Sequence, residues 1–124
     1  MTQALPRRGV ILFAHGSRDP LWRQPMEAVA LRARELDPIA HVECAFLELM
    51  EPDLTTCAAV MVQSGVQSVT VVPMFLGVVR HAREDLPRLV EDLRTTHPHI
   101  EFSLQPAIGE DVRVVELMAM IALA

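Results

Sequence analysis

Residues 10–17 read Val-Ile-Leu-Phe-Ala-His-Gly-Ser, and this stretch decides the fold. The five consecutive apolar residues Val10–Ala14 are typical of a strand that is covered on both faces in a parallel sheet. His15 follows directly, and Gly16 allows the backbone to turn tightly at that point. We therefore expect a buried strand that places an imidazole at the edge of a sheet.

Three further apolar runs predict strands at Val42–Leu47, Val69–Phe75 and Ile100–Leu104. The run Val69–Phe75 is also almost continuously apolar, which predicts a second central strand. Glu43 and Glu101 interrupt the other two runs, which favours strands nearer an edge of the sheet.

Segments with helical period separate and follow these strands, at residues 20–36, 52–65, 83–96 and 110–123. The first segment places one apolar stripe on a helix whose regular part begins as late as Pro25; the stripe consists of Trp22, Met26, Val29, Ala33 and Leu36. The last segment places Val112, Val115, Met118 and Ile121 on one side. The order βαβαβαβα predicts an α/β fold, with a four-stranded parallel sheet and helices on both of its faces.

Composition narrows the class of protein. The 124 residues, 51% of them hydrophobic, are enough for one domain with its own core, and we expect residues 1–8 to form a loose N-terminal segment. The net charge of −5 with no lysine argues against nucleic-acid and anionic-membrane partners. Because no signal-peptide pattern, membrane-spanning stretch or disulfide framework is recognisable, we expect a cytoplasmic protein.

Polar residues follow three of the predicted strands at the carboxyl edge of the sheet, where ligands bind in open parallel sheets. They are His15, Glu48 and His81. Two imidazoles and a carboxylate form a common ligand set for a divalent metal with open coordination positions. Alternatively, Glu48 is a solvated carboxylate or a first-turn charge. His81 has the alternative of being an ordinary helix-start residue, and Asp85, four positions on, is a possible acceptor for an imidazole N–H.

Other polar groups give weaker signals. Ser17 lies in no Gly-x-Ser-x-Gly elbow, so serine hydrolysis is not expected, and the glycines form neither a dinucleotide fingerprint nor a phosphate loop. Cys44 and Cys57 occupy apolar positions and are interpreted as unreactive core thiols. His41 precedes the second strand, so we expect it to be exposed at the opposite edge.

Five short motifs occur in order along nearly the whole chain: residues 14–20 (AHGSRDP), 45–49 (AFLEL) with Glu51-Pro52, 72–76 (VPMFL), 81–87 (HAREDLP) and 106–110 (PAIGE). At these residues the chain resembles the small, single-lobe CbiX-type class II chelatases, which act on sirohydrochlorin. The resemblance implies a flavodoxin-like half domain that works as a homodimer. It also implies that His15 and His81 bind the metal and serve catalysis, with Glu48 as a further ligand.

The implied reaction inserts Co²⁺, or alternatively Fe²⁺ or Ni²⁺, into sirohydrochlorin in cobalamin or siroheme biosynthesis, with no tightly bound cofactor. Arg18, Arg80 and Arg83 flank the two histidines and are candidates for binding the carboxylates of the pigment, with Ser17 beside them. Their alternative role is that of solvated surface residues.

One position departs from the family pattern: Val79 stands where the family usually has a glycine, two residues before the second histidine. We therefore expect a differently shaped loop before His81. A carrier module that binds metal or tetrapyrrole without insertion stays open as an alternative, and so does a zinc-dependent hydrolase built on the same three ligands.

Overall fold

The structure is a computed structural model that describes residues 7–77 and 80–124, without the side chain of residue 81. Strands and helices alternate along the chain as predicted: β1 (Arg8–Ala14), η1 (Pro20–Arg23), α1 (Gln24–Leu36), β2 (His41–Phe46), α2 (Leu54–Gln63), β3 (Ser68–Pro73), α3 (Arg80–Thr96), β4 (Glu101–Leu104), η2 (Ile108–Glu110) and α4 (Val112–Leu123). The predicted loose segment falls mostly on residues 1–6, which lie outside the described part.

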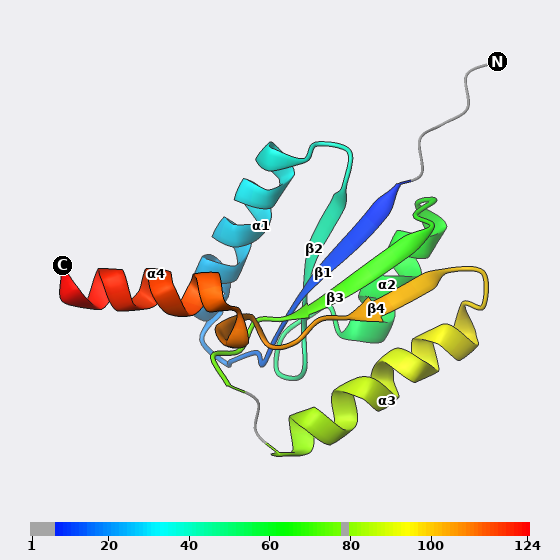
Figure 1. Cartoon of the computed structure of the whole chain (residues 1–124). Coiled ribbons are helices and arrows are strands. Elements are labelled where there is room, and N and C mark those ends of the chain that lie inside the picture. Colours follow the sequence, from blue (N-terminus) through cyan, green and yellow to red (C-terminus); the bar gives the residue numbers. More distant parts are fainter. Residues whose placement is uncertain (1–6, 78–79) are drawn as a thin grey trace.

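The four strands form one parallel sheet in the order β2-β1-β3-β4. The two nearly continuous apolar runs are the central strands β1 and β3, and the two runs interrupted by glutamate are the edge strands, as predicted. Helices α2 and α3 cover one face of the sheet and α1 covers the other (Figure 1).

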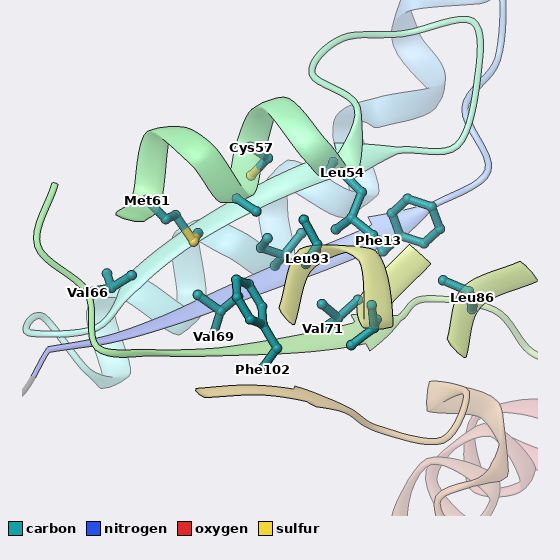
Figure 2. Packing of buried hydrophobic residues seen from close by; sticks show 14 of the residues in the cluster. Phe13, Leu54, Cys57, Met61, Val66, Val69, Val71, Leu86, Leu93 and Phe102 are labelled. Carbon is teal, nitrogen blue, oxygen red and sulfur yellow. The ribbon is translucent and has the colours of Figure 1, made fainter. Parts of the chain in front are cut away.

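The larger core lies between the sheet and helices α2 and α3 (Figure 2). Phe13 and Val71 of the sheet are almost fully buried there, together with Met61 of α2. At Gly9 a Cβ atom would come within 2.8 Å of the Met61 Sδ atom, so the absence of a side chain lets α2 lie close to β1. This packing fixes the sheet from which the site residues extend.

The face of α1 that meets the sheet differs in part from the predicted stripe. Ala30 is the buried residue of α1, and Met26 and Ala33 pack beside it against Phe46 and its neighbours. Val29 and Leu36 of the predicted stripe are 42% and 69% exposed. The small alanines bring the helix close to the sheet and turn these larger side chains outward, an effect that periodicity alone does not reveal.

Helix α4 departs from the sheet and projects away from it (Figure 1). Its first turn is capped by Asp111, whose carboxylate accepts a hydrogen bond of 2.8 Å from the backbone N–H of Arg113. None of its residues is buried, and the predicted stripe is exposed by 38–77%. None of the helices that the structure describes is long and apolar enough to cross a membrane.

Candidate metal and pigment site

The carboxyl edge of the sheet carries the candidate site because backbone pairing continues beyond the strand ends. The Leu47 N–H donates to the Ala14 carbonyl at 2.9 Å, and the Glu48 N–H donates to the His15 carbonyl at 3.0 Å. On the other side, the Met74 N–H donates to the Phe13 carbonyl at 2.7 Å. The loops that follow three separate strands are thereby joined around His15.

Gly16 makes the tightest of these contacts. Its φ of +95° lies in the left-handed region, and a Cβ atom there would come within 1.8 Å of the Glu48 carbonyl oxygen. Any side chain would therefore separate the two loops. The glycine of the His-Gly-Ser stretch is the residue that lets His15 and Glu48 lie next to each other.

Gly109 plays the same part for a third loop. A Cβ atom at Gly109 would come within 2.0 Å of the Leu76 carbonyl oxygen, and its N–H donates to the Phe75 carbonyl at 2.9 Å. The turn η2 is thus held directly against the segment that leads from β3 towards α3.

These loops enclose a cavity of about 300 Å³. Its wall consists of residues from β1, from the loops that follow β1, β2 and β3, and from α3, namely Phe13, His15, Leu47, Glu48, Phe75, Ala82, Asp85, Leu86 and Leu89. His15 is half-buried, and its ring centroid lies 4.3 Å from that of Phe75, with the planes inclined by 33°. The cavity therefore combines an apolar wall with one imidazole and two carboxylates, the side chains of His15, Glu48 and Asp85.

The structure brings two of the three predicted metal ligands, His15 and Glu48, to this one cavity. His81 is the second residue of α3 and the neighbour of Ala82, which lines the cavity, but the side chain of His81 lies outside the described residues. Among the described residues no three His, Cys, Asp or Glu side chains gather closely enough to hold a metal ion. The ligand set that includes His81 stays a prediction.

Asp85 also lines the cavity, four residues after His81. Its carboxylate accepts a hydrogen bond of 2.7 Å from the Arg88 guanidinium. This ion pair joins neighbouring turns of α3 on a partly exposed surface. The Asp85 carboxylate remains at the cavity wall.

The candidate carboxylate-binding residues are not among the described residues that line this cavity. Ser17 accepts a hydrogen bond of 3.1 Å from the Asp19 N–H, so its hydroxyl stabilises the loop. Arg18 is exposed. Arg80 is also exposed, and its Nε atom lies 3.5 Å from the Oε1 atom of Glu84. Arg83 lines an adjacent cavity of about 190 Å³. The departure at residue 79 falls outside the described residues.

The two cysteines are buried and free, as predicted. Burial raises the pKa of the Cys44 thiol to about 11 and that of the Cys57 thiol to about 12. Both thiols therefore stay protonated near neutral pH. Because a metal is bound by the thiolate, neither cysteine is a candidate ligand.

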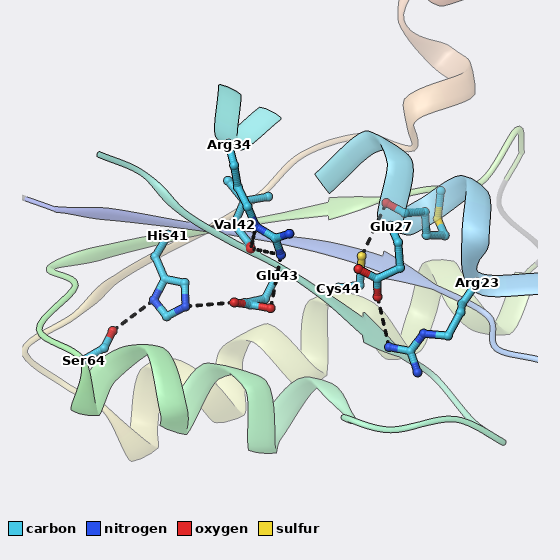
Figure 3. Close-up of polar contacts among 9 residues, drawn as sticks. Arg23, Glu27, Arg34, His41, Val42, Glu43, Cys44 and Ser64 are labelled. Atoms are coloured by element: carbon cyan, nitrogen blue, oxygen red, sulfur yellow. Dashed lines mark hydrogen bonds and ion pairs between the residues drawn. The ribbon is translucent and has the colours of Figure 1, made fainter. Parts of the chain in front are cut away.

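His41, the first residue of β2, is more buried than predicted, with 17% of its side chain exposed, because its ring lies between Glu43 and Ser64 at the end of α2 (Figure 3). One ring nitrogen is 3.0 Å from Ser64 Oγ and the other is 3.2 Å from Glu43. The Ser64 hydroxyl donates to the Met61 carbonyl at 2.7 Å, so the imidazole does not accept its proton. This series of hydrogen bonds links the start of β2, at the edge of the sheet, to the end of α2. It lacks the geometry of a serine that a histidine activates.

Phe75 is the site residue to which sequence analysis assigned no role. It lies in the 72–76 motif, directly after β3, and only 4% of its surface is exposed. A large aromatic residue at the carboxyl end of a central strand was the available signal. Its stacking against His15 depends on loop conformation, which no periodicity encodes.

Comparison with known proteins identifies the family. The family model described as CbiX matches residues 9–121. A relative from Methanopyrus kandleri named sirohydrochlorin cobaltochelatase is 37% identical over 81 residues, which make up 65% of this chain and 57% of that protein. The match therefore spans little more than half the length of that relative.

Two solved structures share the fold. A CbiX protein from Marinobacter aquaeolei assigned to cobalamin biosynthesis superposes with a TM-score of 0.81 and 34% identity, covering 94% of each chain. The sirohydrochlorin chelatase SirB from Bacillus subtilis, in complex with cobalt, gives 0.78 and 28% identity, covering 95% of this chain and 51% of SirB. With the family match over nearly all of its length, this chain belongs to the CbiX family.

Proposed function

We propose that this protein inserts a divalent metal ion into sirohydrochlorin. Membership of the CbiX family and the names of its relatives, sirohydrochlorin cobaltochelatase and sirohydrochlorin ferrochelatase, support the reaction class. The observation that carries the proposal is the placement of His15 and Glu48 in one cavity against the ring of Phe75. Co²⁺ is the metal we favour, since several relatives are named for cobalt, with Fe²⁺ and Ni²⁺ as alternatives.

In this proposal His15 and His81 hold the incoming ion and accept protons from the macrocycle. Insertion removes two pyrrole N–H protons and transfers the ion from protein ligands to ring nitrogens. Neutral imidazole performs both tasks, because it is a base near neutral pH and a ligand of intermediate softness. Glu48 completes the ligand set or orients the ion, and a sparse set keeps the ion transferable.

The pigment carries several carboxylates, whereas the chain has a net charge of −5. Local positive charge is therefore needed at the site. Arg18, Arg80 and Arg83 are exposed and lie close in sequence to the lining residues His15 and Ala82, and with Ser17 they form the proposed binding rim. The ion is a substrate here, and the proposal includes no tightly bound cofactor.

We further propose that the working form is a cytoplasmic homodimer. A cavity of about 300 Å³ is at the lower end of the range of about 300–1,000 Å³ for drug-sized ligands, and a tetrapyrrole is larger than such ligands. A second lobe that closes over the ring supplies the missing wall. The two free, buried thiols agree with a reducing compartment.

A panel of purified protein, sirohydrochlorin and each of Co²⁺, Fe²⁺ and Ni²⁺ tests the reaction by absorbance. Turnover beyond one equivalent per site supports an enzyme. A spectral change that stops at one equivalent contradicts insertion by turnover and supports the carrier alternative. Hydrolysis of ester or phosphate substrates with zinc, without any response to the pigment, would support the hydrolase alternative.

A further inference from the structure

Arg23, the last residue of η1, connects three parts of the structure next to the loop that carries Glu48. Its guanidinium carbon lies 4.9 Å from the centre of the Phe46 ring at the end of β2. Its Nη2 atom donates a hydrogen bond of 3.0 Å to the Glu27 carboxylate of α1 (Figure 3). Its Nη1 atom donates one of 3.4 Å to the backbone carbonyl of Glu51. A planar guanidinium presents several N–H donors in fixed directions, so one side chain makes all three contacts at once.

Glu51 belongs to the loop between β2 and α2, residues 47–53, which we call the Glu48 loop. At Glu48 this loop is held by the loop after β1, because the Glu48 N–H donates to the His15 carbonyl at 3.0 Å. At Glu51 it is held by the guanidinium of Arg23. The Glu48 loop is therefore attached to its surroundings on both sides of the residues between these two points.

Leu49 lies between the two attachment points in a strained backbone conformation. Its φ is +65°, in the left-handed region that residues with a Cβ atom rarely adopt. Leucine has no polar side-chain group that stabilises this conformation locally, and Leu49 is 56% exposed, so burial does not account for it either. Strain of this kind persists only where the surroundings fix the backbone. The attachments at Glu48 and Glu51 therefore hold Leu49 in this conformation.

The turn η1 that carries Arg23 is itself attached to the loop that follows His15. The Asp19 carboxylate at the end of that loop accepts a hydrogen bond of 3.0 Å from the Leu21 N–H of η1. The loops that carry His15 and Glu48 are therefore connected twice, once by direct contact of their backbones and once through Arg23.

We infer that Arg23 is a positioning residue for Glu48 in the proposed reaction. It keeps Leu49 in its left-handed conformation, which directs the Glu48 carboxylate into the cavity that His15 also lines. The inference deepens the proposed function and rests on it, because it explains how one of the proposed metal ligands is placed. Arg23 contacts the loop through a backbone carbonyl, and its own charge is paired with Glu27. It therefore fixes the path of the loop without neutralising the carboxylate that is to meet the metal ion.

Steady-state kinetics of Arg23→Met test this role. Methionine keeps an apolar chain against Phe46 but removes both N–H donors. Loss of a group that orients a metal ligand lowers metal affinity about 10- to 100-fold, so the KM for Co²⁺ is expected to rise by this factor, and the KM for sirohydrochlorin far less. Arg32→Met is the matched control, because Arg32 also lies on α1 in an ion pair of 2.9 Å, with Glu35; its kinetics are expected to match those of the natural chain. An equal rise in both variants, or no rise in Arg23→Met, overturns the inference.

A second substitution separates positioning from packing. Glycine adopts a positive φ without strain, so the loop of a Leu49→Gly chain depends less on Arg23 to keep its path. Adding Arg23→Met to Leu49→Gly is therefore expected to raise the KM for Co²⁺ several-fold less than the same change in the natural chain. Equal effects of Arg23→Met in the two chains would show that Arg23 acts only by packing on Phe46, and would overturn the inference.

The same comparisons apply to Arg23→Lys if Arg23→Met does not fold, as judged by circular dichroism. Lysine keeps the positive charge beside Glu27, but its single ammonium group lacks the planar fork that serves two acceptors while it lies over a ring. The KM for Co²⁺ is expected to rise in this variant as well, and an unchanged KM overturns the inference.

Hydrogen exchange at the Glu48 N–H, measured by NMR, tests the inference without any measurement of activity. This N–H donates to the His15 carbonyl at 3.0 Å, so its exchange is expected to be several-fold faster in Arg23→Met and unchanged in Arg32→Met. An active natural chain whose kinetics and exchange are unaffected by Arg23→Met overturns the inference and leaves the proposed function intact. A natural chain that inserts no metal ion overturns the proposed function and the positioning role with it.

Discussion

The imidazole of His15 lies against the ring of Phe75, with centroids 4.3 Å apart and planes inclined by 33°. Two strands therefore cooperate in setting this side chain, since His15 follows β1 and Phe75 follows β3. The contact restricts the ring to one wall of the cavity, where Glu48 also lies. In the proposed function, this positioning keeps the imidazole beside Glu48, ready to receive the metal ion.

Phe75→Leu is expected to lower the turnover number several-fold, because it removes the ring that positions His15 but keeps the site apolar. The free energy of unfolding is expected to fall by about 1–2 kcal/mol, since Phe75 is buried. Steady-state kinetics and urea unfolding measure the two effects. Phe102→Leu is the control: Phe102 is equally buried beneath α3, and its loss is expected to reduce stability alone. Equal losses of turnover in both variants would show that Phe75 contributes only to packing and does not position His15.

His15→Ala and His81→Ala are each expected to lower metal insertion by about 100-fold or more, which is the usual contribution of a positioned base. Circular dichroism is expected to show an unchanged fold, because His15 lies in the loop after β1 and His81 in the first turn of α3, positions that contribute little to the core. His99→Ala, at an exposed position before β4, serves as the control with normal turnover. Near-normal insertion by either site variant would refute the role of that histidine.

Gly16→Ala is expected to destabilise the protein by more than about 1 kcal/mol and to abolish most of the turnover. The reasons are the φ of +95° and the 1.8 Å approach of a Cβ atom to the Glu48 carbonyl oxygen. Gly77→Ala is the matched control, because a Cβ atom there meets nothing within 4 Å. Thermal unfolding and turnover of the two variants check the prediction, and equal behaviour would show that the loops do not depend on Gly16.

The carboxyl of Asp111 is expected to titrate near pH 2 in the folded protein. Hydrogen bonds from the side chain and the backbone N–H of Arg113 lower its pKa to about 2. Because this value is below the unfolded value of about 3.9, the cap contributes its stabilisation above about pH 4 and loses it as the pH falls through about 2. NMR titration of the carboxyl carbon measures the midpoint. Arg113→Ala is expected to move the midpoint upward, and an unchanged midpoint would contradict the assigned cause.

The sheet could be predicted because burial of a strand on both faces is visible as an unbroken apolar run. Val10–Ala14 and Val69–Phe75 have this pattern, and their strands are central. Topology then placed His15 and Glu48 at one edge, although they are 33 residues apart along the chain. That part of the site follows from the rule that parallel strands end together.

Other features depend on interactions that the sequence pattern does not contain. The sequence does not show which face of α1 meets the sheet. Ala30 and Ala33 allow the helix to approach the sheet closely, and this close packing outweighs the burial of the larger side chains of Val29 and Leu36. The direction in which α4 leaves the fold depends on the turn at Asp111. The apolar stripe of α4 does not determine this direction, because the stripe is equally compatible with packing on the chain's own sheet. The stacking of Phe75 on His15 likewise depends on the path of two loops.

The contact between Gly109 and Leu76 has a mechanical consequence. The backbones of Gly109 and Leu76 are in contact. The turn that leads into α4 and the segment that follows β3 are therefore held at the same point. A displacement of η2, the turn that leads into α4, would therefore also displace Leu76 and the adjacent Phe75, which lines the cavity. The orientation of α4 and the position of the Phe75 ring are thereby coupled through a single glycine.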